Sequence, residues 1–288
     1  MKNLIMSNAP HIHSGNSTKK IMMDVLIALV PAAVAAVVIF GMKALIIEAV
    51  CVVACVAGEY IYNVITKKDQ TVNDLTAAIT GLILALNLDS DMPWYLCILG
   101  SLFAIIAVKC LCGGLGKNFA NPAASGKVLA TLIFSFMTSA VATGETPSMM
   151  DMLIGNRAGA IGETCIIALL IGYVYLVVRD DIKWYVPFAF VATVFVLSFV
   201  FTFSLEKALY EIFGGALFMA AIFMATDYVT TPITVKGKVV FAVGAGIITF
   251  VICHFLNYAE GAVFAILIMN MLVPYIEKTF RNHPLGSK

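Results

Sequence analysis

Long apolar runs separated by short polar segments fill the chain from residue 21 to residue 277. A helix needs about 20 mostly apolar residues to cross a bilayer. The pattern therefore predicts ten membrane-spanning helices and no soluble domain between them. Their predicted ranges are 21–41, 44–65, 74–88, 94–112, 122–141, 159–178, 184–203, 207–226, 238–257 and 260–277.

The ten segments divide into two groups of five, residues 21–141 and residues 159–277, after a polar segment 1–20. An odd number of spans per group inverts one group relative to the other, a common plan in transporters. Polar, glycine-containing segments precede the fifth and tenth spans, and the third and eighth spans both end near an aspartate. We therefore predict an all-α polytopic membrane protein, with residues 1–288 as one domain built from two inverted five-helix repeats that contain short or broken helices.

The distribution of basic residues predicts the orientation, because Lys and Arg concentrate in cytoplasmic loops. With the N-terminus inside, fourteen of the 18 Lys and Arg residues fall on or near the cytoplasmic side. Lys43, Arg157 and Lys207 fall outside, and Lys109 falls within a span. Both termini are therefore expected in the cytoplasm, and the segment 142–158 is expected on the outer side.

Composition supports a membrane protein, since 61% of residues are hydrophobic and 12% are charged. Soluble domains have roughly 45–50% apolar and about 25% charged residues. The net charge of +1 gives no reason to expect a nucleic-acid partner. No signal peptide is recognised, because the first apolar run is long enough to span a membrane. Seven cysteines lie mostly within apolar runs and suggest no disulfide framework.

Three polar clusters stand out. Residues 113–122 are glycine-rich and include Asn118 and Asn121, which could bind the edge of a heteroaromatic ring or could belong to a structural turn. Residues 225–232 place Asp227 among hydroxyl side chains, which suits a ligand, a cation or a helix cap. Residues 143–147 form a polar outer turn that offers two hydroxyls, a glycine and a carboxylate.

Ionisable residues within membrane segments are costly and suggest function. The alternatives are structural: Asp24 as a cap near the start of the first helix, Lys109 extending to the cytoplasmic surface, and Glu48 and Glu59 as buried acceptors. Glu163 is expected at the start of the sixth span, where a carboxylate also stabilises a helix N-terminus. The sequence indicates no metal constellation and no catalytic triad.

The chain resembles the D-type membrane component of the Rnf complex and, more distantly, the B-type membrane component of the sodium-pumping NADH:quinone reductase. Any one matching stretch is weak, but their order and spacing together are specific. The matching residues are 7–12, 17–18, 24–32, 113–118, 121–123, 162–164, 225–227, 229–230, 260–261 and 264–267.

The resemblance implies FMN joined through its phosphate to a threonine within a Ser/Thr-Gly-Ala-Thr motif. Thr143-Gly144-Glu145-Thr146 matches this motif, with Thr146 as the acceptor and a glutamate in place of the alanine. Glu163 and Thr164 are then expected near the FMN. The resemblance also implies a noncovalent riboflavin, for which Asn118, Asn121 and Asp227 are the expected contacts. The protein would bind and orient these flavins and tune their potentials.

Two functions follow from these expectations. The first is a flavin-bearing electron-transfer subunit of a ferredoxin:NAD oxidoreductase that moves Na⁺ or H⁺ across a prokaryotic cytoplasmic (inner) membrane. Such a chain carries no complete active site and works with the other membrane and peripheral Rnf subunits. The alternative is a stand-alone channel or secondary transporter built on the same inverted repeat, in which the Thr146 turn has no necessary role.

Overall fold

The computed structural model describes residues 17–137, 148–155, 159–214, 216–256, 258 and 260–280. Within these ranges the regular secondary structure is helical, and one isolated bridge joins Asp89 and Ala160. The first half contains α1 (Thr18–Phe40), α2 (Met42–Ile65), the 3-10 turn η1 (Val72–Asp74), α3 (Thr76–Leu86), α4 (Trp94–Leu102), the π-helical η2 (Phe103–Cys110) and α5 (Pro122–Met137). The second half contains α6 (Met149–Ile154), α7 (Ile166–Val178), α8 (Tyr185–Thr202), α9 (Leu205–Phe213), α10 (Leu217–Met219), the π-helical η3 (Ala220–Met224), α11 (Val235–Leu256) and α12 (Gly261–Thr279).

Helices occupy part of each of the ten predicted segments. In the described part of the chain, five helices are long and apolar enough to cross a membrane: α1, α2, α8, α11 and α12. The pair formed by α9 and α10–η3 qualifies only if its two pieces count as one bent span, and four further apolar helices are shorter. Many large apolar side chains on the long helices are exposed, as expected for surfaces that face lipid. The chain is therefore an all-helical, multi-pass membrane protein.

Two predicted spans are wrong in detail. The segment 159–178 becomes helical only at Ile166, because the residues before it pair with the end of α3 through Ile161 N–H to Leu88 O (2.9 Å) and Gly162 N–H to Leu86 O (2.8 Å). The segment 207–226 is not one helix, since α9 ends at Phe213 and makes an angle of 62° with the following α10–η3. Both differences arise from tertiary contacts and chain breaks that hydropathy does not report.

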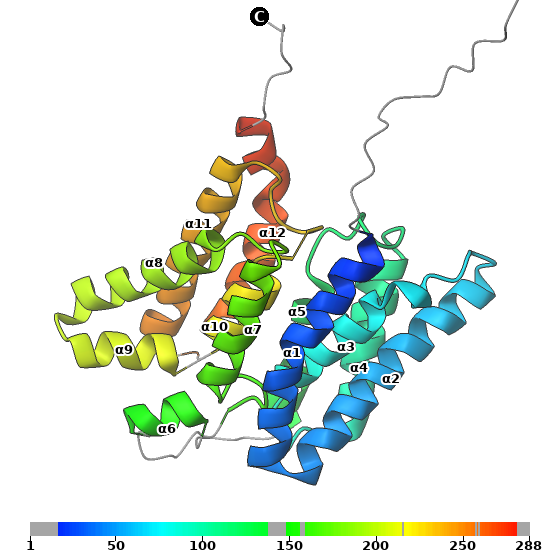
Figure 1. Ribbon diagram of the computed structural model, residues 1–288, viewed down its shortest axis with the longest axis horizontal. Coiled ribbons are helices and arrows are strands. Elements are labelled where there is room, and N and C mark those ends of the chain that lie inside the picture. Colours follow the sequence, from blue (N-terminus) through cyan, green and yellow to red (C-terminus); the bar gives the residue numbers. More distant parts are fainter. Residues whose placement is uncertain are drawn as a thin grey trace, which may run out of the picture.

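The two halves lie side by side (Figure 1). Helix α1 packs against α7 and α5 packs against α12, so the halves meet through equivalent pairs of helices. Gly172 permits the first contact, because a Cβ atom there would lie 2.3 Å from the Ala28 carbonyl oxygen. The start of α1 and the end of α12 lie at one end of the molecule, and α6 lies at the opposite end (Figure 1).

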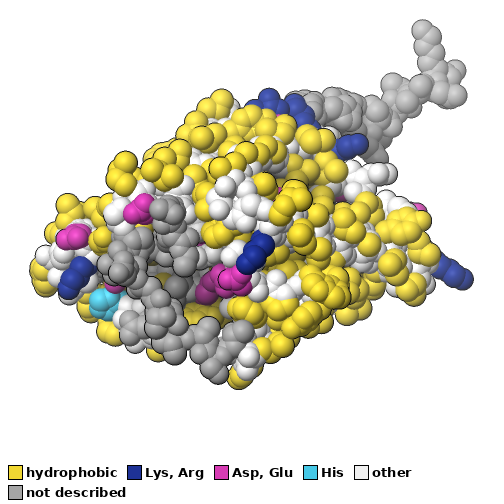
Figure 2. Space-filling view, turned by 90° about the horizontal axis from the view of Figure 1, so that it is seen from below, with side chains coloured by type: hydrophobic (Ala, Val, Ile, Leu, Met, Phe, Trp, Pro, Cys, Tyr) yellow, Lys and Arg dark blue, Asp and Glu magenta, His cyan; other side chains and the backbone are white. Residues whose placement is uncertain are grey.

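The face at the α6 end carries a mixture of side chains (Figure 2). Hydrophobic side chains cover most of its periphery, and acidic side chains gather near its centre beside a basic one. An apolar margin around a polar centre is expected where the margin contacts lipid and the centre contacts water.

Candidate functional site

A pocket of about 800 Å³ lies between the two halves, at the end of the molecule where α1 begins. We refer to it as the central pocket. Its apolar walls come from the first turns of α1, from α3, from the end of α7 and from η3. Its polar lining comes from residues of both halves: Thr76, Thr80, Lys109, Asn118, Asn121, Thr226, Asp227 and Tyr228.

The central pocket joins the three residues expected to bind riboflavin, although Asn121 and Asp227 are 106 positions apart. Asn121 directly precedes α5, and its side-chain oxygen accepts the Ala124 N–H at 3.1 Å. Its Nδ2 donates to Asp227 Oδ2 at 3.4 Å. Asn118 is buried, and its Oδ1 has no hydrogen-bond partner in the described part of the chain. That acceptor is available to a ligand, since buried polar atoms are almost always paired.

The loop before Asn118 depends on glycine. Gly113, Gly114 and Gly116 have φ angles of +112°, +92° and +89°, a region that side chains with a Cβ rarely adopt. A Cβ added at Gly114 or Gly116 would meet nothing within 4 Å. Backbone conformation therefore explains the glycines, and the loop they form delivers Asn118 to the pocket.

Asp227 follows η3 in a tight hydrogen-bonded turn. Its Oδ2 accepts the Thr230 hydroxyl at 3.0 Å and its Oδ1 accepts the Tyr228 N–H at 3.2 Å. Burial raises the pKa of Asp227 above its usual range, and the hydrogen bonds from Thr230 and the backbone oppose that rise. Asn270 of α12 closes the cluster, because its amide bridges the Thr230 carbonyl and the Asn121 N–H at 3.0 and 2.9 Å.

Lys109 is a pocket residue whose predicted place, near the cytoplasmic surface, is wrong. Its side chain is 4% exposed, and its ammonium donates to both oxygens of Glu59 at 2.8 and 2.9 Å. It also donates to Thr76 Oγ1 at 2.7 Å. The pairing joins α2, α3 and η2, and the only sequence signal for it was two opposite charges in separate apolar runs.

A second buried cluster lies toward the other end of the molecule. We call it the Lys127 cluster. The Lys127 ammonium binds Glu163 Oε1 at 2.8 Å and also contacts the Glu260 carboxylate. Lys127 is 1% exposed. Asp89 lies close enough for Glu260 to raise its pKa, although burial is the larger cause of that rise.

The residues expected near an FMN have mixed outcomes. Glu163 and Thr164 lie in the turn before α7 and not in a helix, so the prediction of a helix start is wrong. Glu163 belongs to the Lys127 cluster, and the buried Thr164 hydroxyl has no partner among the described residues. Thr146, the expected attachment residue, lies outside the described residues and stays a prediction.

Two other intramembrane acids are placed by the structure. Asp24 does not cap α1, because Ser17 does so by accepting the Lys20 N–H. Asp24 instead binds Arg179 at 2.8 Å and accepts the Tyr175 hydroxyl at 2.9 Å, which ties α1 to the end of α7. Glu48 is buried on α2, with Oε1 unpaired among described groups. No group of three metal-ligating side chains occurs in the described ranges.

The fold and the central pocket define a multi-pass helical membrane protein with a polar, ligand-sized cavity between its halves. Comparison of sequences identifies the family. The model of the NQR2, RnfD, RnfE family matches residues 5–286, and the chain belongs to this family.

Several relatives, each the D-type component of an ion-translocating complex, match over nearly their whole length. The chain is 38% identical to that of the Na(+)-translocating ferredoxin:NAD(+) oxidoreductase complex of Acetobacterium woodii, over 99% of this chain and 96% of that relative. It is 35% identical to that of the proton-translocating ferredoxin:NAD(+) oxidoreductase complex of Clostridium ljungdahlii, over 98% and 96%. It is 28% identical to that of the ion-translocating oxidoreductase complex of Methanosarcina acetivorans, over 99% and 98%.

Proposed function

We propose that this chain is the flavin-bearing electron-transfer subunit of a membrane ferredoxin:NAD oxidoreductase that couples electron flow to Na⁺ or H⁺ translocation. Near-full-length similarity to the D-type components of such complexes supports the assignment. The chain would work with the other membrane and peripheral subunits, because one helical membrane domain offers no place for ferredoxin or NAD.

The central pocket carries the proposal. Its volume of about 800 Å³ lies within the range of about 300–1,000 Å³ that small-molecule sites have. Apolar walls suit the faces of a planar ring, and the amides of Asn118 and Asn121 suit its polar edge. The unpaired Asn118 Oδ1 supplies an acceptor for a ring N–H. Riboflavin is a ligand of this chemistry, and Asn118, Asn121 and Asp227 would hold it.

FMN would be attached to Thr146, on the outer side of the membrane. The turn lies two residues before Ser148, which caps α6 by accepting the Asp151 N–H. Two residues span at most about 7 Å, so Thr146 would lie near α6 and far from the central pocket. Glu163 and Thr164 would approach the FMN from the turn before α7. The two flavins would then lie toward opposite ends of the chain.

The proposed architecture is ten spans in two inverted repeats, with both termini in the cytoplasm. Helix pairing supports the repeat, because α2 packs on α4 in the first half as α8 packs on α11 in the second. The cross-half pairs α1–α7 and α5–α12 match the same correspondence. The position of the ends of α1 and α12 on one side of the molecule supports the shared location of the termini.

The intact mass of the subunit tests covalent attachment. The full chain, produced with its flavin transferase, is expected to carry one FMN adduct. Thr146→Ala should lose the adduct, and Thr143→Ala, which alters the neighbouring hydroxyl, should retain it. An unmodified wild-type chain, or an adduct that persists in Thr146→Ala, contradicts the assignment.

Flavin released by denaturation tests the pocket. We expect riboflavin in the supernatant of wild type and of Thr146→Ala, because the two sites are separate. Asn121→Leu should lower the riboflavin content strongly, since it removes both the ligand-facing amide and the bond to Asp227. Solute uptake by the purified, flavin-free chain in liposomes would instead favour a stand-alone transporter.

A further inference from the structure

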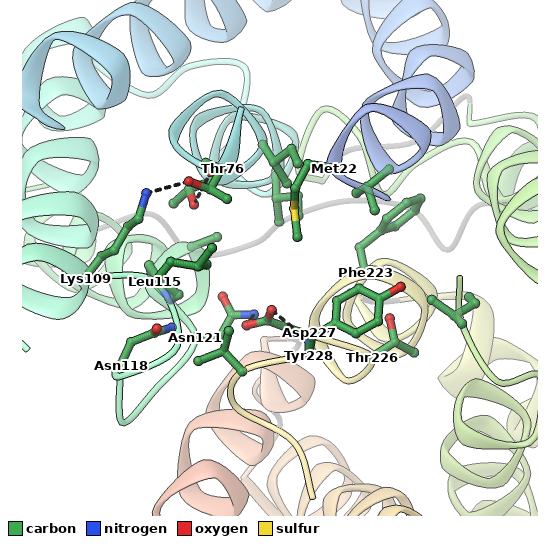
Figure 3. A pocket seen from close by; sticks show the side chains of 18 of the residues that line it. Met22, Thr76, Lys109, Leu115, Asn118, Asn121, Phe223, Thr226, Asp227 and Tyr228 are labelled. Atoms are coloured by element: carbon green, nitrogen blue, oxygen red, sulfur yellow. Dashed lines mark hydrogen bonds between the residues drawn. The ribbon is translucent and has the colours of Figure 1, made fainter. Parts of the chain in front are cut away.

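Lys109 and Asp227 are the two charged residues among those that line the central pocket. They come from different walls: Lys109 lies beside Thr76, and Asp227 lies beside Asn121 (Figure 3). Asp227 accepts hydrogen bonds from Thr230, Asn121 and the Tyr228 N–H, which compensate its charge locally. The charge of Lys109 is therefore the one whose effect on a bound ligand needs explanation.

The Glu59–Lys109 pair is arranged asymmetrically with respect to the pocket. Lys109 and Thr76 line the cavity, whereas Glu59 does not. The carboxylate stands behind the ammonium and holds it through two hydrogen bonds of 2.8 and 2.9 Å. Thr71 and Asn63 continue the network on the far side, because the Thr71 hydroxyl donates to Glu59 at 2.5 Å and accepts from Asn63 at 3.1 Å. The positive end of the pair therefore faces the ligand space.

Stability alone does not account for this pair. A buried ion pair contributes little relative to apolar side chains of similar volume, because both charges lose their hydration. In a low-dielectric interior, however, a fixed ammonium acts on a neighbouring charge far more strongly than it would in water. An ammonium at the wall of a redox site stabilises whichever state of the ligand carries more negative charge.

We propose that Lys109, held in place by Glu59 and Thr76, makes the central pocket prefer the reduced state of its ligand over the oxidised state. This inference rests on the proposed function, in which the ligand is a flavin. Oxidised riboflavin is neutral, and reduction adds negative charge to its ring system. Lys109 thus raises the potential of the bound flavin, and Glu59 limits that rise by partly compensating the ammonium.

The measurement uses the full-length purified chain and riboflavin as the probe. Dissociation constants are determined for oxidised and for chemically reduced riboflavin, and a potentiometric titration of the bound flavin gives the same ratio independently. Lys109→Met should weaken the preference for the reduced form about tenfold, which equals a shift of about 59 mV for a one-electron couple. Glu59→Gln should strengthen the preference.

Opposite shifts separate this role from a structural one. Both single variants break the same ion pair, so damage to the fold would change binding of both redox states in the same direction. Lys43→Met and Asp91→Asn are the matched controls, because these residues form an exposed ion pair at 2.8 Å, with side chains 69% and 74% exposed. Both controls should keep the wild-type ratio.

A double variant keeps the test decisive if the single variants fail to fold. Lys109→Met with Glu59→Leu leaves no unpaired buried charge, and the preference for reduced riboflavin should still fall because the nearer charge is lost. Wild-type protein that binds no riboflavin would overturn the proposed function itself. Wild-type binding combined with an unchanged ratio in the double variant, or with single-variant shifts of the same sign, would overturn only the role of Lys109.

Discussion

Lys127 offers the most direct test of how this membrane domain is held together. Its side chain is 2% exposed and contacts two carboxylates from the second half of the chain, Glu163 and Glu260. Replacing it with methionine keeps the length and apolar stem of the side chain and removes the charge. The variant leaves two carboxylates close together in a buried site, with Asp89 nearby.

The expected loss is large. Removal of one partner from a buried ion pair costs about 3–5 kcal/mol, because the remaining charge is neither hydrated nor compensated. Each kcal/mol shifts the melting temperature by roughly 2–4 °C in a domain of 150–250 residues, so Lys127→Met should lower it by at least about 6 °C. The exposed pair of Lys43 and Asp91 contributes about 0–1 kcal/mol, so Lys43→Met should change it little.

A thiol-reactive fluorophore suits the measurement, since Cys51, Cys55, Cys97 and Cys110 are buried and free and become reactive on unfolding. Melting curves are compared for wild type, Lys127→Met and Lys43→Met in one detergent. Glu163→Gln and Glu260→Gln, added together to Lys127→Met, should recover part of the loss by neutralising the unpaired acids. A melting temperature for Lys127→Met that matches Lys43→Met would refute the reasoning.

Two further substitutions test how α1 meets α7. Gly172→Ala should destabilise by about 1–3 kcal/mol, because its Cβ atom would lie 2.3 Å from the Ala28 carbonyl oxygen. Gly244→Ala is its control, since there the added methyl group meets the flexible end of a methionine side chain. Arg179→Gln should lower the melting temperature less than Lys127→Met does, because the Arg179 side chain is 42% exposed and water partly replaces its pairing with Asp24. The same thermal assay measures all three, and equal losses for Gly172→Ala and Gly244→Ala would contradict the close-approach argument.

The helices were predictable because hydrophobic runs of spanning length have few other solutions in a membrane. The ends of the helices were not predictable to the same degree. The chain before Ile166 is held by backbone hydrogen bonds to Leu86 and Leu88, which belong to the first half of the sequence. A break such as that between α9 and α10 leaves mean hydropathy almost unchanged, so a hydropathy pattern does not reveal it.

The candidate site divides in a similar way. Resemblance to a family supplied Asn118, Asn121 and Asp227, and the structure places all three on one pocket. The sequence gave no sign that Lys109 and Asn270 are partners in this region, because each is a single polar residue in an apolar run. Their roles depend on partners from other helices, and only the folded chain brings those partners within hydrogen-bonding distance.

The proposed inverted repeat explains why the two ends of the protein differ. Asp89 and Asp227 each stand three residues after a helix, α3 and η3 respectively, while Glu260 and Asn121 each directly precede a helix, α12 and α5. Where Asn121 meets Asp227, the amide donates to the carboxylate and the space beside them stays open as the central pocket.

In the equivalent place of the other half, the Lys127 side chain enters the space beside Glu260 and closes it with an ion pair. One framework thus yields a cavity toward one end and a filled ionic cluster toward the other. A ligand in the cavity is held by surrounding walls and polar groups, and so noncovalent binding suffices there. A flavin at the other end has no equivalent cavity in the place that Lys127 fills. Covalent attachment through Thr146 would hold it there instead, which accounts for the two modes of flavin binding in the proposed function.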